Sequence, residues 1–207
     1  MPTDATTGVT QPVTKRGQAT RSAILKAAEE VFGEYSYDRA PVSEITRRAG
    51  VAQGTFYVYF PDKKAVFIEL VHHLNRILRR TIATAIGDAT DRMEMERVGL
   101  RTFFQFIQDH TALYQVMREA QFVDPDTYAW HYDTLAIGYK RGLEEAIERG
   151  QLDPSLDTAI AVDALLGMAE FVGWRYGILG GGMPNDEQFE QLFGLISRGL
   201  MYKGDDE

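Results

Sequence analysis

The segment from Pro41 to Lys64 constrains the fold of this 207-residue chain more strongly than any other. Proline suits the first turn of a helix, because the N–H group that it lacks has no partner there. Pro41 therefore predicts the start of a short helix, and Gly50 predicts its end, since glycine adopts a left-handed C-terminal turn without strain. A second short helix from Val51 completes the arrangement of a helix-turn-helix unit.

Local propensity gives a different answer immediately after this turn. Residues 55–60 are aromatic or β-branched and lie between Gly54 and Pro61, which is typical of a β-strand. We nevertheless predict a helix, because a lone strand here would have no partner strand anywhere in the chain. Phe56 and Phe60 are then interpreted as core residues that seal the unit.

Apolar residues at helical spacing occupy most of the remaining chain. Together with aspartate, proline and glycine at the boundaries, they predict about nine helices and no convincing strand, so the expected fold class is all-α. Thr20 and Asp62 are expected to cap the first and the fourth helix. The predicted helices cover about residues 21–35, 41–49, 51–60, 62–86, 91–107, 110–120, 124–149, 154–180 and 184–202.

Charge is distributed unevenly along the chain, whose total is −8. Residues 1–80 contain 12 Lys and Arg against 8 Asp and Glu, whereas residues 81–207 contain 10 against 22. A basic N-terminal part on an acidic body is typical of a DNA-binding head attached to a domain with another task. Chance clustering of solvated charges is the alternative explanation.

Other classes of protein are excluded or disfavoured. The absence of cysteine excludes disulfides and thiolate metal sites and fits a cytoplasmic location. No signal peptide is visible, and the most apolar stretch, residues 164–183, contains Glu170 and Arg175, so no membrane span is expected. His72 and His73 are adjacent and would point about 100° apart on a helix. With no phosphate loop or catalytic motif in view, we expect no metal, no cofactor and no enzyme activity.

The helix-turn-helix unit predicts which residues contact DNA. The N-terminal residues of its second helix reach base edges in the major groove, so Gln53 and Thr55 face the bases and Gly54 permits a close approach. Tyrosine hydroxyls and a lysine at the next helix N-terminus can reach phosphates. The predicted DNA-binding residues are Arg21, Ser43, Gln53, Gly54, Thr55, Tyr57, Tyr59 and Lys63.

Residues 49–63, with the sequence AGVAQGTFYVYFPDK, closely resemble the signature of TetR-type repressors, and residues 21–32 resemble that family's first helix. The resemblance covers about residues 18–67. It implies an all-helical homodimer that binds a palindromic operator through a three-helix head. It also implies a C-terminal domain that encloses a ligand cavity, repression that the ligand relieves, and a dimer interface built by the two helices nearest the C-terminus.

Three departures from the family pattern affect the head. Ala40 and Pro41 replace the hydroxyl residues often found at the start of the second helix, and Ala52 replaces a common Ser or Thr cap. Gln53 stands where Lys or Arg is frequent, which indicates an altered base preference. We divide the chain into a flexible, basic-tipped tail (1–17), a helix-turn-helix DNA-binding domain (18–62) and a ligand-binding and dimerisation domain (63–207).

The C-terminal part is rich in aromatic residues, most of which must be core. With the family resemblance, some of them are expected to line a pocket for a small, largely apolar effector. Arg118 and Arg175 would hold an anionic head group, as on a fatty acyl thioester, or else form ion pairs with Glu119 and Glu170. The predicted ligand-binding residues are Phe103, Phe106, Tyr114, Arg118, Phe122, Trp130, Tyr139, Phe171, Trp174 and Arg175.

An excess of apolar residues in the stretch 156–180 supports dimerisation through this region and residues 184–202. Ala161, Leu165, Met168, Val172 and Ile178 exceed what a single buried stripe requires. The whole therefore predicts a ligand-responsive repressor that is released from its operator by an apolar effector. The alternative from another class is an all-helical adaptor that binds protein partners and no DNA.

Overall fold

The computed structural model describes residues 12–201, and within that range the chain is helical without a strand. Among these described residues the all-α prediction is therefore confirmed, as are the nine helices. A six-residue π-helical segment, Trp174–Leu179, directly continues α8. The helices are α1 (Lys15–Arg39), α2 (Val42–Ala49), α3 (Gln53–Tyr59), α4 (Lys63–Ile86), α5 (Arg92–Asp109), α6 (Thr111–Val123), α7 (Pro125–Glu148), α8 (Thr158–Gly173) and α9 (Asp186–Leu200).

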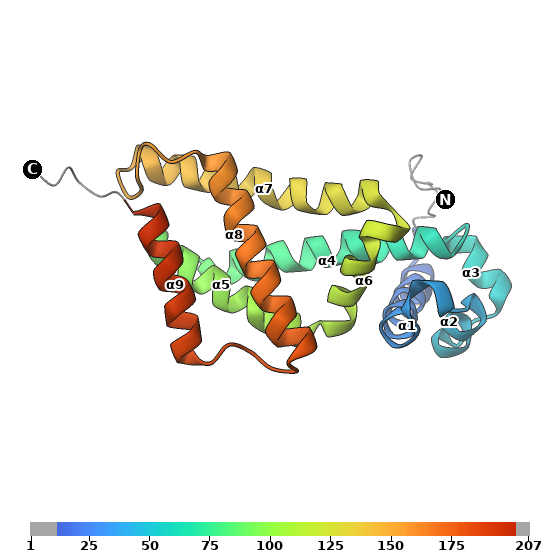
Figure 1. Cartoon of the computed structure of the whole chain (residues 1–207). Coiled ribbons are helices and arrows are strands. Elements are labelled where there is room, and N and C mark those ends of the chain that lie inside the picture. Colours follow the sequence, from blue (N-terminus) through green and yellow to red (C-terminus); the bar gives the residue numbers. More distant parts are fainter. Residues whose placement is uncertain (1–11, 202–207) are drawn as a thin grey trace, which may run out of the picture. The chain divides into compact units, whose positions relative to one another are not determined.

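Two compact units divide the described residues (Figure 1). Unit 1 comprises the chain up to Asn75 together with residues 112–131, and unit 2 comprises residues 76–111 together with the chain from Tyr132. Helices α4 and α7 each contribute residues to both units. The start of α4 and nearly all of α6 are thus grouped with the first three helices, whereas the sequence places a functional boundary after residue 62. That functional division stays a prediction.

The first helix begins earlier than its apolar pattern indicates. Thr14 is its N-cap, because the Thr14 hydroxyl accepts a hydrogen bond from the Gly17 amide at 3.1 Å. The cap predicted at Thr20 is wrong: Thr20 lies inside α1 and its hydroxyl donates to the Arg16 carbonyl at 3.0 Å. The last residues of the predicted tail are therefore helical, and residues 1–11 of it lie outside the described part.

The helix-turn-helix geometry agrees with the sequence. Gly50 adopts φ 68°, the left-handed conformation predicted for the end of α2. Residues 53–59 form a helix and not a strand. Phe56 and Phe60 are each 0% exposed, which confirms them as core residues. Burying a phenylalanine contributes about 1.5–3 kcal/mol, which outweighs the strand preference of a short aromatic run.

The core of unit 1 joins its helices through aromatic contacts. Phe32 of α1 meets Phe67 of α4 edge to face, with ring centroids 5.4 Å apart. Tyr37 contacts the same Phe67 ring at 5.0 Å. Gly33 lets α6 approach α1, because a Cβ at this position would lie 2.7 Å from the Ala112 Cβ. Unit 1 thus holds α6 tightly against the helix that precedes the helix-turn-helix.

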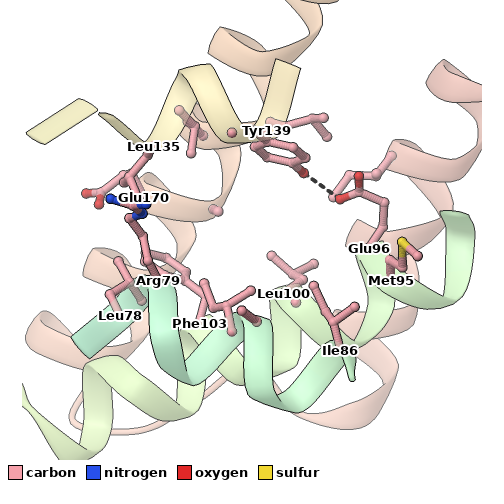
Figure 2. Close-up of a pocket in the computed structure, with 18 of the residues that line it drawn as sticks. Leu78, Arg79, Ile86, Met95, Glu96, Leu100, Phe103, Leu135, Tyr139 and Glu170 are labelled. Atoms are coloured by element: carbon pink, nitrogen blue, oxygen red, sulfur yellow. Dashed lines mark hydrogen bonds between the residues drawn. The ribbon is translucent and has the colours of Figure 1, made fainter. Parts of the chain in front are cut away.

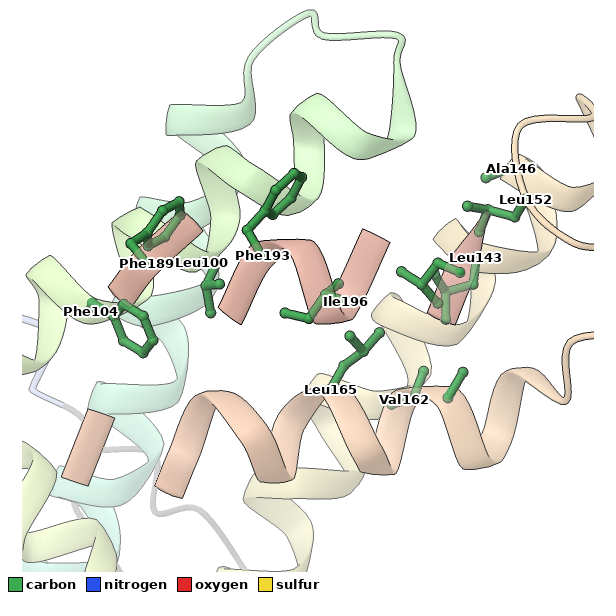
Figure 3. Packing of buried hydrophobic residues seen from close by; sticks show 12 residues of the cluster. Leu100, Phe104, Leu143, Ala146, Leu152, Val162, Leu165, Phe189, Phe193 and Ile196 are labelled. Atoms are coloured by element: carbon green, nitrogen blue, oxygen red, sulfur yellow. The ribbon is translucent and has the colours of Figure 1, made fainter. Parts of the chain in front are cut away.

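The core of unit 2 is built by α5, α7, α8 and α9 (Figure 3). Arg97 and Arg101 of α5 lie over the rings of Phe193 and Phe189 of α9, at 4.0 and 3.9 Å from the ring centroids. Both arginines also pair with Glu190. These contacts fix α9 against α5 by a combination of stacking and charge.

Two of the residues that support a dimer interface in the sequence lie inside this core. Ala161 and Leu165 are 7% and 4% exposed within the single chain, so they are not surplus apolar surface, and that part of the prediction is wrong. The sequence pattern could not distinguish which side of α8 faces the core. Within residues 12–201, no helix combines the length and the apolar character needed to cross a bilayer.

Candidate nucleic-acid interface and ligand pocket

The N-terminal end of α3 presents an accessible surface. Gln53, Gly54 and Tyr57 are exposed, and Thr55 is partly exposed. A Cβ placed at Gly54 would meet no atom within 4 Å, so the helix backbone is open to a close approach at this point. Ser43 on α2 is exposed as well. The structure therefore brings five of the predicted DNA-binding residues to the surface of the helix-turn-helix unit.

Two other predicted contacts are engaged within unit 1. Tyr59 is only 7% exposed, and its hydroxyl would be 3.4 Å from a Cβ at Gly17. The Arg21 guanidinium lies 3.1 Å from the Glu69 carboxylate and stacks 5.3 Å from the centre of the Phe60 ring. The roles of Tyr59 and Arg21 at DNA stay predictions, and both side chains already contribute to packing without it.

Lys63 is held at the C-terminal end of α1. Its ammonium donates to the carbonyls of Tyr37, Ala40 and Asp38 at 2.7, 3.2 and 3.3 Å, and it lies 4.4 Å from the centre of the Tyr37 ring. A cation at a helix C-terminus is favourable, because the free carbonyls there carry partial negative charge. The predicted phosphate contact of Lys63 would have to share or replace these bonds.

The neighbouring arginines of α2 form a separate charged network. Glu44 accepts hydrogen bonds from both Arg47 and Arg48, which lowers the pKa of the Glu44 carboxyl to about 2. Arg48 also pairs with Glu34 of α1. These arginines therefore belong to an internally paired face of unit 1.

Unit 2 contains a pocket of about 350 Å³ (Figure 2). This volume falls in the range of about 300–1,000 Å³ that is usual for sites of small molecules. Most of its wall is apolar, with Leu78, Ile82, Ile86, Leu100 and Phe103 among the residues that line it. The pocket is therefore suited to an apolar molecule.

One side of the pocket carries a buried polar cluster of Arg92, Glu96 and Tyr139. Arg92 donates from Nε to Glu96 Oε1 at 2.9 Å and from Nη2 to the same oxygen. The Tyr139 hydroxyl donates to Glu96 Oε2, as the dashed line in Figure 2 marks. Burial and the nearby Glu96 carboxylate raise the pKa of Tyr139 well above its usual value, so the phenol stays protonated and acts as a donor.

A second pair of charged residues lies on the other side of the pocket. Figure 2 shows Arg79 and Glu170 across the cavity from the bond between Tyr139 and Glu96. Arg79 is exposed and Glu170 is partly exposed. The polar groups of the pocket are therefore concentrated at two opposite places, with an apolar stretch between them.

Of the ten predicted ligand-binding residues, Phe103 and Tyr139 line this pocket. Phe106 is 3% exposed without lining it, whereas Phe171 is 61% exposed. Trp174 and Arg175 belong to the π-helical segment. The remaining four, Tyr114, Arg118, Phe122 and Trp130, belong to unit 1. Aromatic content alone therefore did not locate the cavity.

Sequence reasoning missed Arg79, Arg92, Glu96 and Glu170 as pocket residues. Arg92 and Glu96 are four residues apart, the spacing of an ordinary surface ion pair on a helix, so the pattern gave no reason to bury them. Their partner Tyr139 lies 43 residues further along the chain. The sequence could have indicated these pocket residues only through a combination of features. Arg92 and Glu96 form an ion pair at helical spacing, and Leu100 and Phe103 follow them on an apolar face.

An all-helical chain with an exposed helix-turn-helix and a separate unit that contains an apolar pocket has the architecture of a helix-turn-helix regulator. Residues 24–70 match the model of the family described as bacterial regulatory proteins, tetR family. The HTH-type transcriptional regulator YdgC of Bacillus subtilis is 28% identical over 195 residues, which cover 92% of this chain and 97% of that protein.

Two solved structures share the fold over nearly the whole chain. The fatty acid degradation regulator FadR of Bacillus halodurans superposes with a TM-score of 0.78 at 22% identity, covering 93% of this chain and 100% of that one. FadR of Bacillus subtilis, in complex with stearoyl-CoA, gives 0.76 at 21% identity over 86% and 98%. These comparisons support a TetR-family regulator, and the family model itself matches residues 24–70.

Proposed function

We propose that this protein is a ligand-responsive transcriptional repressor that binds a palindromic operator as a homodimer and leaves it when a small, largely apolar effector binds. The observation that carries the proposal is the pairing, in one chain, of an exposed α3 N-terminus in unit 1 with an apolar pocket in unit 2. A protein that bound DNA without regulation would have no use for the pocket.

Base recognition is assigned to the exposed start of α3. Gln53 can form paired hydrogen bonds with adenine in the major groove, and Thr55 can contact either a base or a thymine methyl group. Tyr57, which is 49% exposed, supplies a hydroxyl for a phosphate. One such helix reads only a few base pairs, so useful specificity requires two copies of the chain on a symmetric site.

The dimer is assigned to the outer face of α8. Ile160, Ala164, Gly167 and Phe171 recur at helical spacing and are all exposed in the single chain. The two large members of this stripe, Ile160 and Phe171, are 67% and 61% exposed. Small residues between two large ones let a second helix approach closely. Burying the stripe against a symmetric partner would remove apolar surface from water on both chains.

The same helix faces the pocket with its other side, through Leu165, Leu166 and Ala169. A ligand that shifts these residues therefore acts on the helix that is assigned to the dimer. Displacement of α8 would change the distance between the two recognition helices and so weaken DNA binding. The stearoyl-CoA bound to FadR of Bacillus subtilis supports a fatty acyl thioester as the effector class.

Gel-shift titration of the full chain against its own upstream region tests DNA binding. We expect Gln53→Ala to change the ranking of operator sequences, with losses of about 1–3 kcal/mol where the glutamine contacts a base. Partly exposed Gln121 of α6 offers a matched control, since Gln121→Ala removes the same side chain away from α3. The absence of any sequence-selective complex would favour the adaptor function instead.

Light scattering on a stripe variant tests the dimer. Phe171→Glu should produce monomers and abolish operator binding, because it places a charge in the proposed apolar contact. Phe122→Glu is the control, since Phe122 is 83% exposed but lies on α6. An intact dimer in Phe171→Glu would exclude the outer face of α8 as the interface.

A further inference from the structure

The polar cluster in the pocket of unit 2 has hydrogen-bonding capacity that the protein itself does not use. An ionised carboxylate offers about four acceptor positions. Among the described residues, Glu96 receives three hydrogen bonds, two from Arg92 on Oε1 and one from Tyr139 on Oε2. The Arg92 guanidinium has five N–H donors, of which two bind Glu96, and the Tyr139 oxygen is also hydrogen-bonded to Arg92. The cluster can therefore accept a further hydrogen bond through Glu96 and donate one through Arg92.

The charge of the cluster is already balanced within the protein. The Arg92 side chain is 11% exposed and the Glu96 side chain is 8% exposed, and the two are paired. The guanidinium is also held along α7, since a Cβ at Gly142 would meet Arg92 Nη1 at 2.6 Å. Arg92 is therefore confined by its neighbours and cannot swing freely to meet an incoming anion.

A carboxylate placed beside this cluster would meet unfavourable surroundings, and the other charged side of the pocket likewise carries both signs, with Arg79 and Glu170. The incoming carboxylate would lose its hydration shell, face the Glu96 carboxylate, and find the buried guanidinium already neutralised. An ammonium group would be desolvated beside Arg92 and would gain little, because the charge of Glu96 is already compensated. An uncharged hydroxyl or amide avoids both costs, and it can donate to Glu96 while it accepts from Arg92.

We propose that the pocket selects an uncharged ligand with an apolar body and one hydroxyl or amide group, which donates a hydrogen bond to Glu96 and can accept one from Arg92. This inference rests on the proposed function, because it takes the pocket to be the effector site. A fatty acyl thioester of coenzyme A meets the requirement only through its uncharged amide and hydroxyl groups, with its phosphates outside the pocket.

Calorimetric titration can measure which ligands the pocket prefers. The full chain is titrated calorimetrically, without DNA, with four probes that share one hydrocarbon chain: 1-dodecanol, 1-methoxydodecane, dodecanoate and dodecylammonium. We expect dodecanol to bind at least about tenfold more tightly than each of the other three, which corresponds to about 1.4 kcal/mol. The ether tests the donor hydrogen, and the two ions test the charge.

Substitution of Glu96 tests whether the polar cluster causes the preference for an uncharged ligand. Glu96→Gln should lower the preference for dodecanol over dodecanoate by about tenfold, because it removes the buried anion and leaves Arg92 unpaired. The control is Glu94→Gln, which removes the same charge from an exposed position on the same helix and should leave the preference unchanged. If Glu96→Gln does not fold, the ranking of probes on the unaltered chain still decides the question.

A cavity-filling variant separates this inference from the proposed function. A Cβ at Gly138, which lines the pocket, meets no atom within 4 Å, so Gly138→Phe can occupy the pocket space. Equal or tighter binding of dodecanoate or dodecylammonium, abolished by Gly138→Phe, would overturn the selection and leave the effector site standing. Binding that Gly138→Phe does not weaken, or no binding of any probe, would overturn both.

Discussion

The two compact units use polar side chains in different ways. In unit 1 two partly buried side chains bind backbone groups: Lys63 donates to three carbonyls, and Glu119 accepts from the Tyr37 amide at 2.6 Å. In unit 2 the buried charges bind each other, as Arg92 and Glu96 do beside the pocket. The first arrangement fixes the path of the chain around the DNA-binding head. The second leaves hydrogen-bonding groups of both partners facing a cavity.

The largest expected effect comes from the aromatic core of unit 1. Phe56→Ala should lower the free energy of unfolding of this unit by about 3–5 kcal/mol, because the cavity left by a fully buried ring cannot collapse completely. Urea titration can follow each unit separately, since Trp130 belongs to unit 1 and Trp174 to unit 2. Single-tryptophan backgrounds should show the larger shift for Trp130.

The control for this change is Phe122→Ala in the same unit, whose side chain is 83% exposed and whose loss should change stability by less than about 0.5 kcal/mol. Identical shifts of both tryptophan signals in Phe56→Ala would mean that the units unfold as one. The two units would then differ in how their polar side chains bind, but not in their stability to unfolding.

Lys63 ranks second in expected effect. Lys63→Ala should lower the free energy of unfolding by about 1.5–3 kcal/mol, because it leaves three carbonyls at the end of α1 without their charged donor. Lys64→Ala is the matched neighbour and should cost less, since its ion pair with Asp124 is half exposed. Thermal or urea unfolding of the two variants measures the difference.

The same variant distinguishes two roles of Lys63 at DNA. A direct phosphate contact requires the slope of log affinity against log salt to fall by about one unit in Lys63→Ala. A purely positioning role predicts weaker binding with an unchanged slope. Affinity and slope that both match the unaltered protein would show that the head does not depend on this lysine.

His131 makes the stability of unit 1 depend on pH. Burial lowers the pKa of this imidazole to about 4, and the Asn75 amide lies 3.3 Å from its Nδ1 and donates to its backbone carbonyl at 3.1 Å. The unfolded chain, with a histidine pKa of about 6.5, therefore takes up the proton first as the pH falls. Stability from this group is complete above about pH 6.5 and is lost progressively towards pH 4.

At pH 5 the expected loss is about 2 kcal/mol relative to neutral pH. Urea unfolding at pH 7.5 and pH 5 measures it, with His131→Gln as the reference that carries every other titrating group. A variant with the same pH dependence as the unaltered protein would assign the acid sensitivity to the surface carboxylates.

The smallest effect concerns the start of α1. Thr14→Ala should destabilise the chain by about 1 kcal/mol, because the Gly17 amide loses its side-chain acceptor. Thr20→Ala, inside the helix, should be neutral or slightly stabilising, since alanine is the better helix former. A larger loss of stability in Thr20→Ala than in Thr14→Ala would support a helix that begins at Thr20, as the apolar pattern predicts.

The sequence by itself determined the local plan of the head. Pro41, Gly50 and the spacing of Phe56 and Phe60 act over one or two turns, and such short-range constraints are written directly in neighbouring residues. Asp62, Asp91 and Asp157 likewise cap α4, α5 and α8 through bonds to amides two or three residues away. The all-α class and the resemblance to the TetR family followed from these local features.

Only the tertiary structure decided where the pocket lies and which groups line it. Tyr139 meets Glu96 across 43 residues, and Phe103 lines the cavity while Phe106, on the same helix, is buried elsewhere. The apolar pattern predicts that Leu165 contributes to a dimer interface, but Leu165 packs into the core, while Ile160 and Phe171 are exposed. Apolar periodicity predicts that a helix has an apolar face, but it does not identify the helix that packs against that face. The neighbour is determined only by the packing of several helices together.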